Sequence, residues 1–219
     1  MATIATLHDL MIHQLRDIYS AEKQLVQALP KMVKNANTEE LQDALSTHLN
    51  ETQEHVARLE QAFELLGVSS RGMKCKGMEG LIEEGKELFE EDVDPEVLDA
   101  GIIAASQRIE HYEIAAYGTV CEYARSMGHD ELLALLDATL AEEKQADTTL
   151  TTIAEGGINA LANRGDPMGA MDADQDEDVE MAGGEERASG NGSPARKTPT
   201  KNSRPSRASQ SSKGTTRPR

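Results

Sequence analysis

Aromatic residues are scarce in this chain of 219 residues: they form 3% of it, and tryptophan is absent. Cysteine occurs twice, at Cys75 and Cys121, with no CxxC pair, which excludes a disulfide framework. No stretch approaches the roughly 18 consecutive apolar residues of a membrane-spanning helix. The first residues, MATIATLHDL, lack the charged and apolar regions of a signal peptide. We therefore expect a soluble, cytoplasmic protein with no membrane partner.

Acidic charge is in excess, and it is unevenly distributed. The net charge is −17, and residues 1–162 hold 30 acidic against 12 basic residues. Beyond them Gly, Ser, Pro and Thr dominate, so we expect residues 163–219 to form a disordered tail. Within it, residues 172–186 carry eight acids and no base, and residues 187–219 carry nine bases and no acid. An acidic body attracts cations, whereas a basic arm attracts nucleic-acid phosphates.

Helix-forming residues fill the chain before that tail. Ala, Leu, Glu and Gln dominate it, and the apolar residues recur at helical spacing with no strand-like alternation. This pattern predicts four long helices and a short one, over residues 7–34, 39–66, 78–92 (the short one), 95–127 and 130–155. The residues that mark these bounds are Thr38 and Asp94-Pro95 as starts, and Gly67, Gly128 and Gly156-Gly157 as stops.

The connections between these helices determine the predicted topology. Short loops join the first long helix to the second and the third to the fourth, so each pair is antiparallel. Residues 67–94, which join the second long helix to the third, are long enough to cross the bundle. We therefore predict an all-α, ferritin-like, antiparallel four-helix bundle over residues 1–162, with one long crossover that contains the short helix.

Each long helix carries acidic residues on or beside its apolar face, near its middle. Glu113 is the clearest case, because at 100° per residue it points the same way as Ile109 and Ala116. Glu54, His111 and Glu142 point away by the same test. The eight candidate metal ligands that remain are Glu22, His48, Glu51, His55, Glu110, Glu113, Glu143 and Asp147.

Positions near mid-helix meet at one level in an antiparallel bundle, so these side chains should converge. Buried unpaired carboxylates are costly, and they either take up protons or bind cations. Oxygen-rich sites with one or two imidazoles suit iron or manganese, and di-iron bundles use Glu and Glu-x-x-His. The spacings here, such as His48-x-x-Glu51 and Glu110-x-x-Glu113, fit that pattern only in part. A metal-free bundle with protonated or hydrogen-bonded carboxylates is the structural alternative.

Five phrases of the sequence resemble the YciE/YciF family of ferritin-like proteins: DIYSAEKQLVQALPKM, HLNETQEHVARLE, KGMEGLIEEG, QRIEHYEIAAYGT and LAEEKQAD. The resemblance covers residues 7–162. It implies a ferritin-like bundle with a carboxylate-rich dinuclear metal site, a homodimer and a role in bacterial stress responses. The family's acidic positions fall on Glu22, Glu51, Glu110, Glu113 and Glu143, and His48 and Asp147 also match.

The resulting hypothesis is a redox-active site with two iron ions, manganese being the other metal that the ligands suit. Glu51 and Glu143 are the expected bridging ligands, and the reaction would oxidise ferrous iron or consume peroxide. Two alternatives belong to other functional classes. In the first, the bundle only sequesters metal or binds a partner. In the second, the basic arm binds nucleic acid, without sequence preference because it has no aromatic residue for base stacking.

Overall fold

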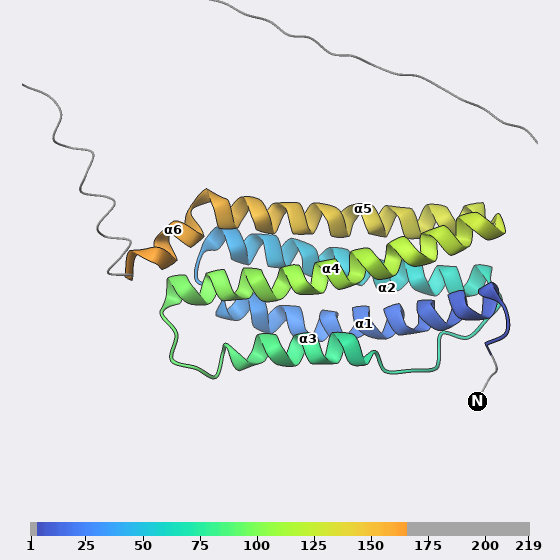
Figure 1. Ribbon diagram of the computed structural model, residues 1–219, viewed down its shortest axis with the longest axis horizontal. Helices are drawn as coiled ribbons and strands as arrows, with labels where there is room; N and C mark the ends of the chain where they lie inside the picture. The colour runs from blue at the N-terminus through green and yellow to red at the C-terminus, as the bar shows by residue number, and fades with distance from the viewer. Residues whose placement is uncertain (1–3, 166–219) are drawn as a thin grey trace, which may run out of the picture. The chain divides into compact units, whose positions relative to one another are not determined.

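Four long helices lie side by side in the computed structural model of the protein, which describes residues 4–165 (Figure 1). They are α1 (Leu7–Asn35), α2 (Glu39–Leu65), α4 (Pro95–Met127) and α5 (Asp130–Ile153). Short turns join α1 to α2 and α4 to α5, and the long crossover joins α2 to α4. The predicted all-α, antiparallel four-helix bundle with one crossover is confirmed. The described residues include no strand.

The helix ends have identifiable causes in the sequence. Thr6 and Asp9 form a reciprocal capping box at the start of α1, since Thr6 Oγ1 accepts from the Asp9 amide and Asp9 Oδ2 accepts from the Thr6 amide. Gly67 and Gly128 end α2 and α4 with φ of 63° and 73°, a left-handed conformation that favours glycine. The predicted positions of these two stops are confirmed.

The start of α2 is capped from another helix. Thr38 occupies the predicted cap position, but its side chain makes no capping hydrogen bond. Asp99 of α4, which is completely buried, supplies the cap instead. Its carboxylate accepts hydrogen bonds from the Asn37 and Thr38 amides, at 2.7 and 2.9 Å, and from Asn37 Nδ2 at 3.1 Å. This long-range cap fixes the α1–α2 turn to the beginning of α4.

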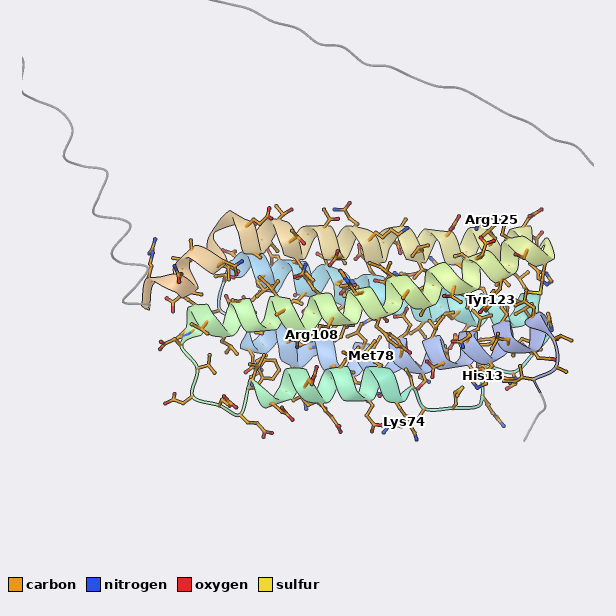
Figure 2. The ribbon with its side chains drawn as sticks, viewed as in Figure 1. His13, Lys74, Met78, Arg108, Tyr123 and Arg125 are labelled. Carbon is orange, nitrogen blue, oxygen red and sulfur yellow. The ribbon has the colours of Figure 1, made fainter. Side chains whose placement is uncertain are left out.

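The crossover holds α3 (Lys76–Glu87), which packs against α1 and α4 (Figure 1). The predicted range of 78–92 was wrong at both ends. The helix begins earlier because the Cys75 thiol caps it by accepting from the Met78 amide, and it ends at Glu87. Met78 is fully buried on the inner side of α3, and Lys74 lies just before this helix on the outer side (Figure 2). Gly77 lies so close to Tyr112 that a Cβ there would approach Tyr112 Cε2 at 2.9 Å.

The chain continues past the glycine pair that the sequence analysis assigned as a stop. Residues Ala154–Ile158 form a π-helical turn, followed by the short helix α6 (Asn159–Ala162). Gly157 has φ of 151°, so the chain kinks there and returns Ile158 to the core, where it is 5% exposed. The predicted stop at the glycine pair is confirmed, because Gly157 is non-helical, but the short helix beyond it was not predicted. Residues 166–219, which hold the acidic run, the basic arm and most of the predicted disordered tail, lie outside the described residues.

The apolar core is divided into two clusters. One contains Leu25 and Ile109, and the other contains Ile18 and Leu59. On α1, Glu22 lies one turn from both Ile18 and Leu25, so it falls between the clusters. The two clusters thus hold the four helices together on both sides of a polar layer. No described helix is long and apolar enough to cross a membrane.

Candidate metal centre

Six buried ionisable side chains from all four long helices fill the layer between the two apolar clusters. They are Glu22, His48, His55, Glu110, Glu113 and Glu143, and each is at most 6% exposed. They form two groups, in each of which one ligand atom per residue lies within 4.8 Å of the others. These six side chains are called the central cluster below.

The first group consists of His48, Glu110, Glu113 and Glu143. It joins α2, α4 and α5, and its closest nitrogen–oxygen approach is 3.2 Å between His48 Nε2 and Glu110 Oε1. One imidazole and three carboxylates form a donor set that suits iron or manganese.

The second group consists of Glu22, His55 and Glu143. His55 Nδ1 lies 3.1 Å from Glu143 Oε1 and 3.6 Å from Glu22 Oε1. Glu143 belongs to both groups, so its carboxylate stands where a ligand shared by two metal ions would stand. Its partner in the predicted bridging pair, Glu51, belongs to neither.

The central cluster is rich in buried atoms without hydrogen-bond partners. Both carboxylate oxygens of Glu113 and of Glu143 have none among the described residues, and the same is true of Glu22 Oε2 and Glu110 Oε2. Buried polar groups are almost always hydrogen-bonded, because an unpaired one costs roughly 1–3 kcal/mol or more. Metal coordination would satisfy these oxygens, so the residues present fit a pair of metal ions.

Without metal, the central cluster holds more protons than the same groups in water. Burial, together with the Glu22 and Glu143 carboxylates, raises the pKa of Glu113 well above its usual value. Burial lowers the pKa of His55, but Glu143 and Glu22 outweigh it and raise that pKa to about 10. For His48, burial is likewise outweighed by Glu110, and the pKa rises to about 9. Metal ions would have to displace these protons.

Glu142, a partly exposed residue of α5, orients the His55 ring. Arg58 donates to Glu142 through both terminal nitrogens, with 2.9 Å from Nη2 to Glu142 Oε1, and this contact lowers the pKa of Glu142. The ionised Glu142 can only accept, so His55 Nε2, which lies 2.9 Å from its Oε2, carries the hydrogen. When the ring gives up its second proton to bind metal, Nδ1 becomes the unprotonated nitrogen, and it faces Glu22 and Glu143. This is the usual arrangement around a metal-binding histidine.

Tyr117 orients the first carboxylate of the second group. Its hydroxyl, fully buried, donates to Glu22 Oε1 at 2.5 Å and leaves Glu22 Oε2 without a partner. Burial and the Glu22 carboxylate raise the pKa of Tyr117 well above its usual value, so the phenol keeps its proton. Glu22 and His55, both of the second group, are thus each held in place by a hydrogen bond to a residue outside the central cluster.

Two of the eight predicted ligands lie outside both groups. Glu51 has a side chain that is 38% exposed, with Oε2 3.7 Å from His48 Nδ1. Asp147 is 24% exposed and contacts His111 Nε2 and Gln107 Nε2, each at 3.2 Å. Both residues follow a central-cluster residue by about one helical turn, but the offset turns them toward a helix edge. Their role as ligands stays a prediction.

Glu142 and Arg58 are the residues around the cluster that the sequence analysis missed. Glu142 was assigned to the outer face, and its side chain is 33% exposed, yet its carboxylate reaches back across the helix seam to His55. A usable signal was present in α2, where Arg58 follows His55 by three residues and shares its face. An arginine beside a candidate ligand indicates a nearby carboxylate.

Comparison with known proteins gives the family context. A family model described as Domain of unknown function (DUF892) matches residues 6–163. Protein YciF of Escherichia coli (strain K12) is 44% identical over 158 residues, which are 72% of this chain and 95% of YciF. The crystal structure of that stress protein matches with a TM-score of 0.69, covering 71% of this chain and 99% of YciF.

Two further solved structures share the fold. YcfI of Rhodopseudomonas palustris is 47% identical, with a TM-score of 0.66 over 68% of this chain and 95% of YcfI. The protein XCC3681 of Xanthomonas campestris pv. campestris is 24% identical, with a TM-score of 0.59 over 73% of this chain and 98% of that protein, and it supports the fold alone.

Proposed function

The chain belongs to the DUF892 family and is a relative of the stress protein YciF, and from that premise we propose that it is a stress-associated protein with a di-iron centre. Its two iron ions would occupy the two groups of the central cluster. In this proposal the protein oxidises ferrous iron and consumes peroxide. The geometry of the buried cluster by itself shows that it could hold metal.

The observation that carries this proposal is the position of Glu143. Its carboxylate is completely buried, belongs to both ligand groups, and has no hydrogen-bond partner among the described residues at either oxygen. Glu143 would therefore be a ligand common to both ions, and glutamates are the usual ligands in di-iron bundles. In a purely structural role, Glu143 would have the His55 ring, whose Nδ1 lies 3.1 Å from Glu143 Oε1, as its compensating cation.

The ligand roles follow from the two groups. His48, Glu110 and Glu113 would bind one ion, Glu22 and His55 the other, and Glu143 both. Four carboxylates carry enough negative charge to balance two divalent cations. This set has one imidazole for each ion, as a di-iron carboxylate site requires.

Two ferrous ions bound there would together supply the two electrons that reduce one hydrogen peroxide to two water molecules, with the uptake of two protons. The chain's own residues prepare the site for this reaction. Glu142 holds the His55 ring with Nδ1 toward the cluster, and Tyr117 fixes one oxygen of Glu22. The two apolar clusters keep bulk water away from the carboxylates on both sides.

The experiment is a measurement of metal per chain, followed by the absorption spectrum after anaerobic addition of ferrous iron and then peroxide. We expect about two metal ions per chain and an absorption change linked to oxidation. Glu113→Ala should bind about one metal ion per chain and lose the absorption change, whereas Glu54→Ala, a substitution of an exposed glutamate on α2, should keep both ions and the absorption change.

Two other results would argue against this function. A wild-type protein without stoichiometric metal would leave the central cluster a set of buried acids with a structural role. Iron that binds without any change on addition of peroxide would support metal sequestration in place of oxidation.

The composition of residues 187–219 supports a second candidate function. Nine bases and no acid give this segment the charge of arms that bind nucleic-acid phosphates without sequence preference. We propose to test it by removing residues 163–219. DNA retention that falls steeply with salt should disappear in the truncated protein, while metal binding should remain. DNA binding that persists after truncation would contradict this role of the arm.

A further inference from the structure

A cavity of about 210 Å³ lies between α2 and α5, and it reaches the central cluster from the surface. Its lining includes His48 and Glu110 of the cluster and Glu51. The small side chains Ala44 of α2 and Ala146 of α5 also line it, and they leave space between the two helices.

The inner end of the cavity holds candidate ligand atoms that have no hydrogen-bond partner among the described residues. His48 and Glu110 are 6% and 2% exposed, and both ring nitrogens of His48 and Glu110 Oε2 make no hydrogen bond to any described residue. Buried polar atoms that face a cavity in this state are suited to bind something that enters it. These atoms belong to the first ligand group, so an ion in the cavity would be beside its binding site.

The charge of the lining selects the kind of ion. Its lining contains the carboxylates of Glu51 and Glu110 and the ring of His48, and no lysine or arginine. The cavity between α1 and α3 differs, since three lysines line it beside Glu79 and Glu83, and no residue of the central cluster does. A carboxylate at the exposed end of a cleft raises the local concentration of cations there. The mouth of the α2–α5 cavity, at Glu51, therefore attracts cations.

Glu51 stands where solvent and cluster meet. Its side chain is 38% exposed, so it can contact a hydrated cation, and its Oε2 lies 3.7 Å from His48 Nδ1. A carboxylate at this place can exchange one water of the ion for itself before the ion moves inward to the His48 ring. This position explains why Glu51 shares a face with the ligands and yet lies outside both groups.

We propose that the α2–α5 cavity is the access route by which divalent metal ions reach the central cluster, and that Glu51 captures them at its mouth without remaining a ligand. This inference rests on the proposed metal-binding function. It assigns the cavity, Glu51 and the small residue Ala146 to metal uptake, and it leaves the bound state to the six residues of the central cluster.

The rate of metal uptake tests this proposal, and the chain offers a direct signal for it. It has four tyrosines and no tryptophan, so its ultraviolet fluorescence comes from tyrosine. Tyr117 contacts Glu22, and a paramagnetic ion in the cluster should quench its emission. The apo protein is mixed with cobalt(II) in a stopped-flow instrument at low salt, and metal per chain is then measured at equilibrium.

Two variants disturb the route in different ways. Glu51→Gln removes the charge at the mouth, and Ala146→Leu narrows the cavity with a larger side chain. Each should slow quenching about tenfold, which is the lower end of the effect of a charged cleft on association rates. Both should still bind as many ions per chain as the wild type. Glu54→Gln, which changes an exposed glutamate on the same helix, should load at the wild-type rate.

The failures are distinguishable. If the wild type binds no cobalt, both the proposed function and the access route fail. If the wild type binds cobalt and both variants take it up as fast as the wild type does, the proposed access route is wrong, but the proposed metal site is not affected. A lower number of ions in Glu51→Gln would make Glu51 a resident ligand and overturn its role in capture alone.

Discussion

Two regions of α4 bury a carboxylate completely, and they treat it in opposite ways. Asp99, at the beginning of the helix, accepts three N–H hydrogen bonds from Asn37 and Thr38. Glu113, near its middle, accepts none from any described residue and faces the Glu22, Glu110 and Glu143 carboxylates. Burial alone therefore does not identify a metal ligand. The difference lies in whether the protein itself satisfies the charge.

The largest effect should follow from Asp99→Ala. This change removes the buried acceptor of the Asn37 and Thr38 amides at the α1–α2 turn, so we expect the free energy of unfolding to fall by about 3 kcal/mol. Urea denaturation of the apo protein measures it, and metal per chain should not change. A loss below about 1 kcal/mol would show that Asp99 is not a structural cap.

Glu113→Leu should act in the opposite direction on the apo protein. Leucine fills a similar volume and removes a desolvated acid among other acids, so we expect the free energy of unfolding to rise by about 1–2 kcal/mol. The same variant should lose metal at the first group. If this change destabilises the apo protein, the Glu113 carboxyl group has hydrogen-bond partners there and stabilises the fold, as Asp99 does.

Glu142→Gln tests the hydrogen bond that orients His55. The amide keeps the shape but releases Arg58 and weakens the hold on His55 Nε2, so we expect metal affinity to fall about tenfold with the number of sites unchanged. Competition with a chelating dye measures the affinity. Glu131→Gln, an exposed position on α5, is the control. Equal metal affinities of the two variants would show that the hydrogen bond from His55 to Glu142 does not support metal binding.

The free energy of unfolding should depend on pH in different ways when the central cluster is protonated and when it holds metal. In the folded apo protein the pKa values of His48 and His55 are raised from 6.5 to about 9 and about 10, and those of Glu110 and Glu113 are also raised. The folded state thus holds protons that the unfolded state has lost, so apo stability should fall as pH rises from about 6.5 to about 10, by less than about 1.4 kcal/mol per proton and pH unit.

Added manganese should reverse this trend, because metal competes with the same protons and binds more tightly as pH rises. Melting temperatures at pH 6, 7.5 and 9, with and without manganese, measure both trends. Apo stability that increases over this interval, or stabilisation by manganese that shrinks, would show that the cluster does not hold these protons.

The sequence predicted the helices well because their signals are local. Apolar spacing and the stops at Gly67 and Gly128 depend on neighbouring residues, and the bounds agree to within a few positions. The end of the chain's helical part was harder to predict. The chain kinks at Gly157, and a short helix follows. This helix forms where Ile158 packs into the tertiary core, and such packing cannot be predicted from the local sequence.

The site was predictable at the level of helix faces and less so at the level of single contacts. Glu22, Glu113 and Glu143 stand in apolar stripes, and the structure brings them together. Glu51 lies on the same side of α2 as the histidines, but a helical wheel does not fix whether an edge residue faces the interior or the mouth of a cavity. Contacts such as Glu142 to His55 and Asp99 to Thr38 depend on side-chain rotamers and helix crossings, which a single sequence does not reveal.

The most direct test of the central claim is the number of metal ions bound by three single-alanine variants beside the wild type. If Glu143 is shared, Glu143→Ala should bind almost none, Glu22→Ala and Glu113→Ala should each bind about one, and the wild type about two. If Glu143→Ala still binds two ions per chain, or if it behaves no differently from the other two variants, the carboxylate is not shared and the account of a dinuclear centre is wrong.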